Sequence, residues 1–299
     1  MDIRVYLKVR QDLIDRFLNR YLREWERHPT NLYKAMYYSV FTGGKRLRPI
    51  LTLAVGELFG VKRKALLPFA CTLELIHTYS LIHDDLPALD NDDLRRGKLT
   101  SHKLFGEGMA LLSGDALLTE AFHLMTQPQV VRALESKLVL ELVHEISHAA
   151  GGGGLVGGQA VDLEVGGRKM DVATVESIHA LKTGALILTA ARVGAMVGGA
   201  APRELRRISR FGGFLGLAFQ ITDDILDAEG SAGEPNQTKG SNNNHKEREK
   251  ATYPFVAGFP TAKARARELL KNCLREVEPF GVAADPLRGI AHYVVERAV

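Results

Sequence analysis

The sequence predicts an all-α protein, built as a single large helical bundle, and two observations carry this prediction. Apolar residues recur at helical spacing along most of the chain, for example between Leu7 and Leu22 and between Leu134 and Ile146. Strict alternation of apolar and polar residues is absent, as are Asn-Gly and Asp-Gly turns between β-branched runs, so strands and hairpins are not expected.

Short breaks divide the chain into about ten or more expected helices. The breaks occur at His28-Pro29, Phe59-Gly60, Gln127-Pro128, Gly198 to Pro202 and Phe280-Gly281. Two of the helices, one ending near Asp84 and one near Asp227, are apolar nearly all round. A helix without a polar face belongs at the centre of a bundle, so we expect both of them there.

Two segments depart from the helical pattern. Residues 151–158 contain six glycines in eight positions, which suits either a domain linker or a close approach to the backbone by another helix or a ligand. The composition is the same on both sides, which favours the close approach. Residues 228–250 are polar and rich in Gly, Asn and Lys, so they cannot bury a core face. This segment is expected to be either a disordered loop or a lid that orders over a ligand.

Composition and charge exclude several classes of protein. The 299 residues are 45% apolar and 25% charged, as in ordinary globular proteins and unlike disordered, collagen-like or small disulfide-rich chains. The length alone suggests about two domains, but no linker stands out, so one domain over residues 1–299 is expected. A net charge of +4 is too mild to imply nucleic-acid binding.

The sequence also favours a cytoplasmic protein without a membrane span. It contains two cysteines, Cys71 and Cys273, far apart in the chain, which suits a reducing compartment. The N-terminal residues carry charges throughout and contain no apolar core of a signal peptide. The most apolar stretch, residues 184–202, includes Arg192 and falls short of the ~20 apolar residues that span a bilayer.

The strongest chemical signal is two clusters of aspartate, each directly after an apolar helix. Five aspartates lie between Asp84 and Asp93, and such a charge run alone suits a solvated surface equally well. The second cluster, Asp223, Asp224 and Asp227, shares one helical face, where like charges repel unless a cation lies between them. Carboxylates without His or Cys suit Mg²⁺ held together with substrate phosphates. A calcium-binding EF-hand loop is excluded, because its turn-glycine and closing-glutamate positions hold Arg and Ser.

The first aspartate cluster is interrupted by Leu86-Pro87. Asp84 and Asp90 are six residues apart, about 600° around an ideal helix, and would point in different directions. Pro87 cannot donate a hydrogen bond to the carbonyl of His83 and distorts a helix. We therefore expect the helix to end or bulge here, which lets Asp90 swing back towards Asp84.

Cationic residues accompany the acids. Arg95 and Arg96 directly follow the first cluster, and arginine forks suit diphosphate oxygens. Residues 43–49 read GGKRLRP and place three cations beside a flexible glycine pair. This is either a solvated surface turn or a site for a second anionic group that binds without metal. The polar side chains of Lys182, Thr183 and Gln220 stand within apolar segments, as satisfied core residues or as part of a pocket.

These motifs together resemble those of the trans-isoprenyl diphosphate synthases, most closely the bacterial farnesyl diphosphate synthases. The aspartate motifs read DDLPALD at 84–90 and DDILD at 223–227. GGKRLRP at 43–49, LELIH at 73–77, GGQAVDL at 157–163 and KTGAL at 182–186 match in the family order. The resemblance runs from about residue 30 to the end of the chain. It implies a single bundle around a deep central cavity, usually as a homodimer.

The resemblance also implies a reaction and its site residues. Such an enzyme condenses isopentenyl diphosphate with dimethylallyl and geranyl diphosphate, by Mg²⁺-assisted ionisation and head-to-tail coupling. The implied ligands of three Mg²⁺ ions are Asp84, Asp85, Asp90, Asp223, Asp224 and Asp227. The implied allylic-diphosphate site contains Arg95, Lys182, Thr183, Gln220 and Lys239. Isopentenyl diphosphate is implied to bind at Lys45, Arg48, His77 and Arg96, although a core histidine explains His77 nearly as well.

The segment after the second aspartate motif departs from the family pattern, Gly-Lys-x-x-Gly-x-Asp followed by Lys-x-Thr-Tyr-Pro. The end survives at residues 250–254, whereas residues 236–244 lack the acid. Lys239 lies within this altered stretch, so closure of a lid over residues 228–250 need not follow the family.

Product length is expected to depend on Tyr79 and Ser80, which precede Asp84 on the same helix. At about 1.5 Å rise per residue, Tyr79 lies about 7–8 Å along the axis from Asp84. A tyrosine ring there suits the floor of the pocket for the growing chain, whereas Ser80 is too small. Farnesyl-making relatives are similar in having an aromatic residue here, so farnesyl diphosphate is the expected main product and geranylgeranyl diphosphate the alternative. Tyr79 could instead be ordinary core, with the floor on the helix that contains Leu112 and Ser113.

Two other functions were weighed against this one. A class I terpene cyclase would need Ser or Thr at position 227 and Glu at position 231, where this chain has Asp227 and Ser231. A non-catalytic partner subunit typically lacks one aspartate motif, and both motifs are present here.

Overall fold

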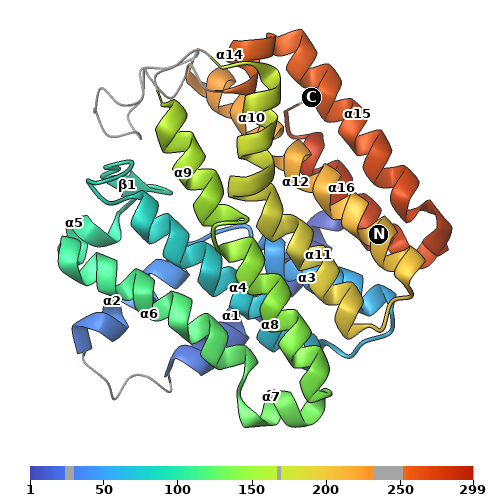
Figure 1. Cartoon of the computed structure of the whole chain (residues 1–299), viewed down its shortest axis with the longest axis horizontal. Coiled ribbons are helices and arrows are strands. Elements are labelled where there is room, and N and C mark those ends of the chain that lie inside the picture. Colours follow the sequence, from blue (N-terminus) through green and yellow to red (C-terminus); the bar gives the residue numbers. More distant parts are fainter. Residues whose placement is uncertain (24–29, 167–169, 232–251, 299) are drawn as a thin grey trace.

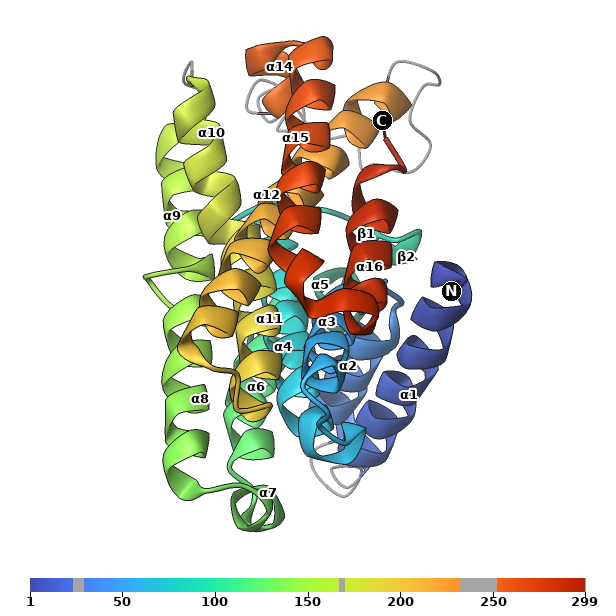
Figure 2. The same ribbon diagram turned by 90° about the vertical axis from the view of Figure 1, so that its right-hand side faces the viewer.

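The computed structural model describes residues 1–23, 30–166, 170–231 and 252–298. In this described part the chain is almost entirely helical, and the predicted all-α class is confirmed. The helices lie side by side, with α3, α4 and α11 in the middle of the bundle (Figures 1 and 2). The expectation that hairpins are absent is wrong at one place: two strands of two residues each, β1 and β2, pair as a small antiparallel hairpin after α4, with Arg96 and Gly97 at positive φ in its turn.

The N-terminal half contains α1 (Ile3–Arg23), α2 (Thr30–Phe41), α3 (Leu47–Leu58), α4 (Arg63–Asp84), β1 (Leu94–Arg95), β2 (Lys98–Leu99), α5 (Ser101–Phe105), α6 (Glu107–Met125), α7 (Pro128–Ala133) and α8 (Ser136–Ala150). The C-terminal half contains α9 (Leu155–Val165), α10 (Val172–His179), the π-helical turn η1 (Ala180–Gly184), α11 (Ala185–Val197), α12 (Pro202–Ser231), α14 (Tyr253–Ala257), α15 (Phe259–Val277), the 3₁₀ segment η2 (Glu278–Ala284) and α16 (Asp285–Val295).

Helix α4 lies at the centre of the bundle and ends at Asp84, both as the sequence predicts. Fifteen of its 22 residues are buried, and it packs against α3 and α6. Helix α11 packs on α3 and on α12, which in turn packs on α15. The two helices that carry the aspartate motifs are thus linked through α3 and α11.

Helix α12 continues beyond the end that the sequence predicts. The expected end was near Asp227, with a loop from residue 228, but the helix extends to Ser231. Glu229 forms a 2.8 Å ion pair with Lys263 of α15, which holds the last turn of α12 against that helix. The first residues of the expected loop over 228–250 are therefore helical. Residues 232–250, including Lys239, lie outside the described residues.

Glycines allow the helices around α12 to approach one another closely. A Cβ atom on Gly158 of α9 would lie 2.3 Å from the backbone nitrogen of Lys182 in η1. A Cβ atom on Gly216 of α12 would lie 2.8 Å from Cα of Gly184. Of the two interpretations of residues 151–158, close helix approach is the one confirmed. The contact brings α9, η1 and α12 together, and π-helical turns such as η1 are frequent at functional sites.

Two helical stretches are long and apolar enough to cross a membrane by length and composition: α4 and residues Val172–Val197. Of their most apolar windows, 78% and 50% respectively are buried inside the protein, as in the core helices of a bundle. Cys71 and Cys273 are both buried and free.

Candidate active site

The chain turns back on itself directly after α4, as the Leu86-Pro87 interruption predicts. The backbone N–H of Asp90 donates a 2.8 Å hydrogen bond to the carbonyl oxygen of Asp84. Asn91, with a φ of 52°, donates to the carbonyl oxygen of Leu86 at 3.1 Å. Asp84 and Asp90 are therefore held at the same end of α4, although they are six positions apart in sequence.

Arg95, on the β1–β2 hairpin, reaches back to Asp85 at the end of α4. Its Nε donates to both carboxylate oxygens of Asp85, at 2.7 Å to Oδ1 and 2.9 Å to Oδ2. Burial raises the pKa of Asp85 to about 6, and the neighbouring Arg95 opposes this rise. Arg95, which is expected to bind diphosphate, thus pairs with Asp85, which is expected to bind Mg²⁺.

The first residue of the second cluster, Asp223, has a cationic partner too. Arg297, near the C-terminus, forms a 2.7 Å ion pair with Oδ1 of Asp223. Burial raises the pKa of Asp223, whereas Arg297 and Lys45 lower it. The C-terminal residues and the basic turn at residues 43–49 therefore both lie close to α12.

Asp224, the next residue, takes part in a different set of contacts. Its Oδ2 accepts a 2.8 Å hydrogen bond from the backbone N–H of Tyr253 in α14 and lies 3.3 Å from Nε2 of His179. Its Oδ1 accepts a hydrogen bond from Nε2 of Gln220 at 3.1 Å. Both carboxylate oxygens of Asp224 are thus used to hold α10, α12 and α14 together.

A cavity of about 180 Å³ lies between α9, η1 and α12. It is lined by Asp90, Asp162, Val175, Ile178, His179, Lys182, Thr183, Gln220, Asp224 and Thr252. One member of each aspartate motif therefore faces the same space. Lys182 Nζ lies 2.7 Å from Oδ2 of Asp162, and the Thr183 hydroxyl donates to Oε1 of Gln220 at 2.8 Å. Lys182, Thr183 and Gln220 were interpreted either as core residues with satisfied hydrogen bonds or as part of a pocket. They have hydrogen-bond partners and also line a pocket, so both interpretations are correct.

The donor set of the two clusters fits a divalent cation. All of the expected ligands are carboxylates, which suit Mg²⁺. Among the described residues, no group of three or more His, Cys, Asp or Glu side chains is arranged to hold an ion by itself. Carboxylates from both motifs, of which Asp90 and Asp224 line the cavity, suit an ion whose remaining ligands are supplied by substrate phosphates.

The basic turn at residues 43–49 lies beside α12. Nζ of Lys45 is 5.6 Å from the centre of the Phe219 ring, and the Arg297 guanidinium is 4.9 Å from the same ring. Burial lowers the pKa of Lys45, and the positive charge of Arg297 lowers it further. Several cations are therefore crowded together here, which favours the binding of an anion.

Arg48, His77 and Arg96 complete this basic group. Arg48 is 7% exposed, and its Nε has no hydrogen-bond partner among the described residues. Burial lowers the pKa of Arg48 to about 10. Arg96 donates a hydrogen bond to the carbonyl oxygen of Gly43. Burial, followed by the charges of Arg48 and Arg96, holds the pKa of His77 well below its usual value. A buried arginine with an unused donor is costly unless an anion pairs with it, so the site interpretation of the turn is favoured over a solvated surface.

Tyr79 and Ser80 are buried in α4 but do not line the cavity described above. The Tyr79 ring makes an edge contact with the His83 ring at 5.7 Å, and Asp84 contributes to raising the pKa of Tyr79, after burial. Of the alternative floor residues, Leu112 is 54% exposed, whereas Ser113 is fully buried. Within one chain, Tyr79 and Ser113 are thus the buried candidates.

Three residues of the site were not assigned from the sequence: Asp162, His179 and Arg297. Asp162 lies in the GGQAVDL segment, whose match to the family was noted without a role for its acid. His179 and Arg297 carry no local signal, because their partners, Asp224 and Asp223, are distant in sequence. The sequence-assigned residues do not all meet in one place. Those that line the cavity are Asp90, Lys182, Thr183, Gln220 and Asp224. Asp84, Asp85 and Arg95 lie where α4 ends, and the basic group contains Lys45, Arg48, His77 and Arg96.

Comparison with known proteins gives a consistent result. Residues 29–281 match the Polyprenyl synthetase family. A farnesyl diphosphate synthase of Geobacillus stearothermophilus is 42% identical over 99% of this chain and 98% of its own. A geranylgeranyl diphosphate synthase of Cyanophora paradoxa is 40% identical over 98% and 95% of the two chains. The crystal structure of an FPP/GFPP synthase from Zymomonas mobilis superposes with a TM-score of 0.85, at 37% identity, over 97% of this chain and 99% of that one.

Proposed function

Because the chain belongs to the polyprenyl synthetase family, whose members are prenyltransferases acting on isoprenyl diphosphates, we propose that it joins isopentenyl diphosphate to dimethylallyl and then geranyl diphosphate, with farnesyl diphosphate as its main product. The observation that carries the proposal is the pairing of two anion-binding environments. The protein has a cavity lined by one residue of each aspartate motif, and it also has a buried basic turn that includes an arginine donor without a partner among the described residues. Two substrates that each carry a diphosphate need two such sites.

The allylic diphosphate is assigned to the cavity. Lys182 and Arg95 would contact the departing diphosphate, and their charges stabilise the negative charge that accumulates on it. The allylic carbon–oxygen bond breaks, and its electron pair leaves with the diphosphate. Thr183 and Gln220, joined by a 2.8 Å hydrogen bond, present fixed oxygen dipoles beside the carbon that becomes cationic. Lys239 belongs to this group by resemblance alone and lies outside the described residues.

Isopentenyl diphosphate is assigned to the basic turn, at Lys45, Arg48, His77 and Arg96. Its double bond attacks the allylic cation, and the new cation loses a proton, which the leaving diphosphate can accept. The low pKa of His77 keeps its imidazole neutral, so that it can donate a hydrogen bond without adding charge. A buried arginine fork at Arg48 suits bidentate contact with the diphosphate.

Mg²⁺, when bound, would supply positive charge to the allylic diphosphate, and the proposal includes about three ions. Asp84, Asp85, Asp90, Asp223 and Asp227 are the ligands proposed for them. Asp224 was expected in this set. Both of its oxygens are engaged with Tyr253, His179 and Gln220, so we assign it to holding α14 beside the cavity.

The proposed product length rests on Tyr79, which is 5% exposed and lies one and a half turns before Asp84. An aromatic ring at this position would stop the chain at farnesyl length. The alternative product is geranylgeranyl diphosphate, which a relative of similar identity is named for.

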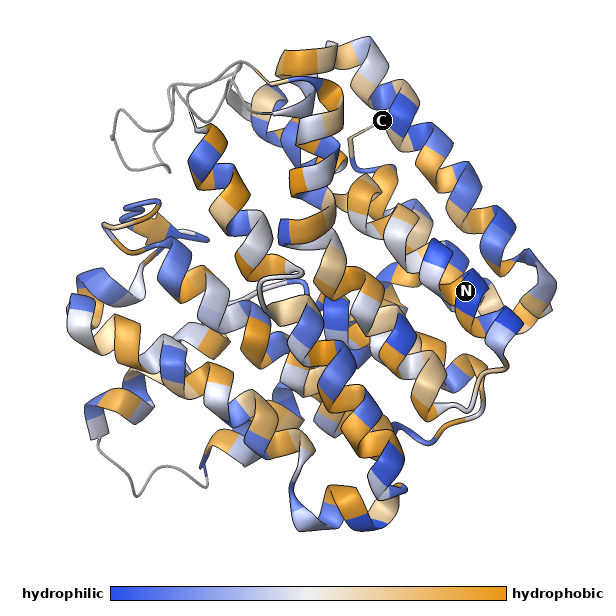
Figure 3. Cartoon of the chain, viewed as in Figure 1, coloured by the Kyte–Doolittle hydropathy of each residue, from blue (hydrophilic) through white to orange (hydrophobic). Residues whose placement is uncertain are grey.

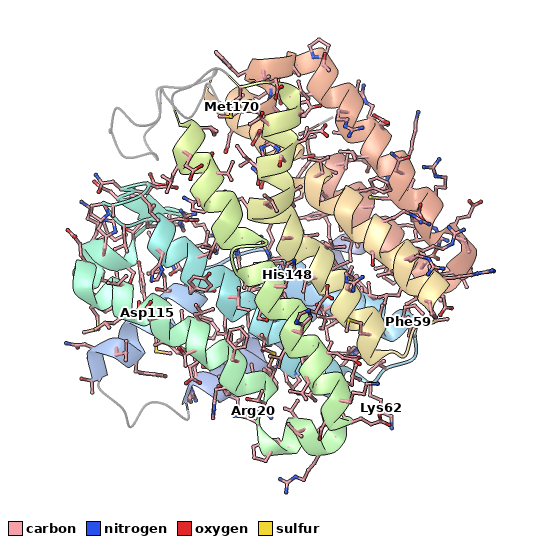
Figure 4. All side chains as sticks on the ribbon, in the orientation of Figure 1. Arg20, Phe59, Lys62, Asp115, His148 and Met170 are labelled. Atoms are coloured by element: carbon pink, nitrogen blue, oxygen red, sulfur yellow. The ribbon has the colours of Figure 1, made fainter. Side chains whose placement is uncertain are left out.

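The proposal also includes a cytoplasmic homodimer of a single 1–299 domain. Leu111 and Leu112 on α6 are 47% and 54% exposed, and Leu104 on α5 is 47% exposed. Apolar positions recur along the viewer-facing side of α6 in Figure 3, and Asp115 on the same helix is labelled in Figure 4. A second copy covering this face would bury these leucines. Light scattering should give twice the chain mass, and the double variant L111K/L112K should give the mass of one chain.

The activity is tested by incubating the protein with Mg²⁺, isopentenyl diphosphate and dimethylallyl diphosphate. Chromatography of the dephosphorylated products should give farnesol as the main alcohol. Geranylgeraniol as the main alcohol would support the alternative product. A cyclic hydrocarbon, or no product with folded protein, would refute the prenyl-coupling proposal.

A further inference from the structure

We propose that Arg46 is a positioning residue: it contacts no substrate, and it fixes the turn from which Lys45 and Arg48 reach the diphosphate of isopentenyl diphosphate. This inference rests on the proposed function of the basic turn. Arg46 is the second of the three cations of GGKRLRP. The family resemblance assigns the other two, Lys45 and Arg48, to isopentenyl diphosphate and gives Arg46 no role. The structure separates them clearly.

The Arg46 side chain uses each of its three guanidinium nitrogens on a different partner inside the protein. Nε donates to Oδ1 of Asp15 at 2.9 Å, Nη1 to Oε1 of Glu74 at 2.8 Å, and Nη2 to the carbonyl oxygen of Val40 at 2.6 Å. These partners lie on α1, α4 and α2, and Arg46 is only 4% exposed. Each nitrogen of this buried guanidinium thus has a partner within the bundle.

The backbone of Arg46 explains why such a firm hold is needed. Its φ of 51° and ψ of 34° lie in the left-handed region, which is unfavourable for a residue with a side chain. Its carbonyl oxygen accepts the hydrogen bond of Ile50 N–H at 3.0 Å, so the same residue starts α3. Gly43 and Gly44, with φ of 112° and 140°, give the preceding chain its freedom. The Arg46 contacts therefore help to hold this segment in one conformation.

Two other hydrogen bonds hold the turn at its glycines. Gln11 of α1 donates to the carbonyl oxygen of Gly44 at 3.0 Å, and Arg96 donates to that of Gly43. Lys45, by contrast, lies over the Phe219 ring of α12. Arg46 therefore anchors the turn to α1, α2 and α4, while the preceding residue extends towards α12.

Arg46 has a second effect, through Glu74. This glutamate is 3% exposed, and its negative charge also acts on Arg48 and Arg96. While Glu74 is paired with Arg46, Arg48 keeps a donor free of protein partners among the described residues. Once released, Glu74 would compete with the diphosphate for Arg48. Removal of Arg46 should thus weaken the binding of isopentenyl diphosphate in two ways. It loosens the turn, and it frees Glu74 to compete for Arg48.

The test variant is Arg46→Lys, which keeps the charge but cannot make the three contacts together. We expect the KM for isopentenyl diphosphate to rise about tenfold, with the KM for geranyl diphosphate and the kcat changed less than about twofold. The matched control is Arg192→Lys. Arg192 also uses three nitrogens, on Glu145 and Ser209, but lies outside the basic turn and the cavity lining. It should lower the melting temperature without moving the KM for isopentenyl diphosphate.

Two further variants separate the possible causes. Glu74→Gln in the Arg46→Lys background should recover part of the KM increase, because the competing anion is removed. If Arg46→Lys does not fold, Asp15→Asn, at the more exposed end of the contact, provides the same test with a smaller increase in KM. A parallel increase in both KM values, or an unchanged KM for isopentenyl diphosphate in a folded variant, would overturn the inference.

Lys45→Ala distinguishes this inference from the function on which it rests. If Lys45→Ala raises the KM for isopentenyl diphosphate and Arg46→Lys does not, the positioning role alone is wrong. If Lys45→Ala leaves that KM unchanged, the turn does not bind this substrate, and the proposed site falls together with the inference.

Discussion

Replacement of Tyr79 by alanine should lengthen the product, because it removes the ring proposed to close the pocket. Tyr79 is 5% exposed and packs edge-on against His83 at 5.7 Å. Loss of a buried aromatic side chain costs about 3–5 kcal/mol of unfolding free energy through lost contacts and the cavity that remains. The aromatic contact accounts for about 0.5–1.5 kcal/mol beyond the burial itself.

A space of this kind can be filled by the additional isoprene unit of a longer product. We expect the Y79A variant to make geranylgeranyl or longer diphosphates as its main products, whereas Tyr79→Phe, which keeps the ring, should still stop at farnesyl. The assay is chromatography of dephosphorylated products at matched turnover. Calorimetry should also show that geranylgeranyl diphosphate raises the melting temperature of the variant more than it raises that of the unsubstituted protein.

Tyr21 provides the control for a general effect of an enlarged core. It is also 5% exposed, but it lies on α1 and its hydroxyl donates to Glu120 of α6. Tyr21→Ala should lower stability by a comparable amount and leave the product length unchanged. Farnesyl diphosphate as the main product of an active Y79A enzyme, or longer products from Y21A as well, would refute Tyr79 as the floor.

Three further predictions concern the charged residues. Lys45→Ala and Arg48→Ala should each raise the KM for isopentenyl diphosphate about tenfold or more, since a hydrogen bond to a charged group contributes about 1.5–3 kcal/mol; steady-state kinetics that show equal weakening of the allylic substrate would contradict the two-site assignment. Asp84→Ala or Asp223→Ala should abolish turnover while circular dichroism retains the helical signal, and chelation of Mg²⁺ should do the same; a loss of helix would instead make these aspartates structural. Burial raises the folded-state pKa of Asp85 to about 6, above its unfolded value, so this carboxyl lowers the unfolding free energy increasingly as pH rises from about 4 to about 6. Protonation of Asp85 should also weaken Mg²⁺ binding as pH drops below about 6. Calorimetric Mg²⁺ titrations that give one affinity from about pH 5 to about pH 7.5 would contradict this.

Local chemistry made part of the site predictable. The hydrogen bond between Asp90 and Asp84 follows from a proline that cannot continue α4, and the crowding at Gly158 follows from a glycine-rich segment beside a helix. Contacts between distant residues could not be foreseen in this way. One example is the ion pair of Glu229 with Lys263, which joins the last turn of α12 to α15.

The same limit applies to the roles within each motif. Asp224 belongs to an aspartate motif, but its environment depends on Tyr253 and His179, which no spacing rule connects to it. Within GGKRLRP, the resemblance gives roles to Lys45 and Arg48 alone, and the role of Arg46 can be inferred only from its partners Asp15 and Glu74, which are distant in sequence.

The ion pairs of the site also bear on how a charged substrate binds there. Asp85, Asp223 and Asp162 are paired with Arg95, Arg297 and Lys182, so each of these three acids already has a cationic partner. When a diphosphate binds with its metal ions, each of these acid–base pairs can open. The base then pairs with the diphosphate, and the acid pairs with a metal ion. The site need not bring unpaired charges out of water at the moment of binding, which is the step that makes buried charge costly. The binding free energy of a diphosphate at these residues is therefore a difference between new and existing ion pairs, which makes it smaller than the new pairs alone would give.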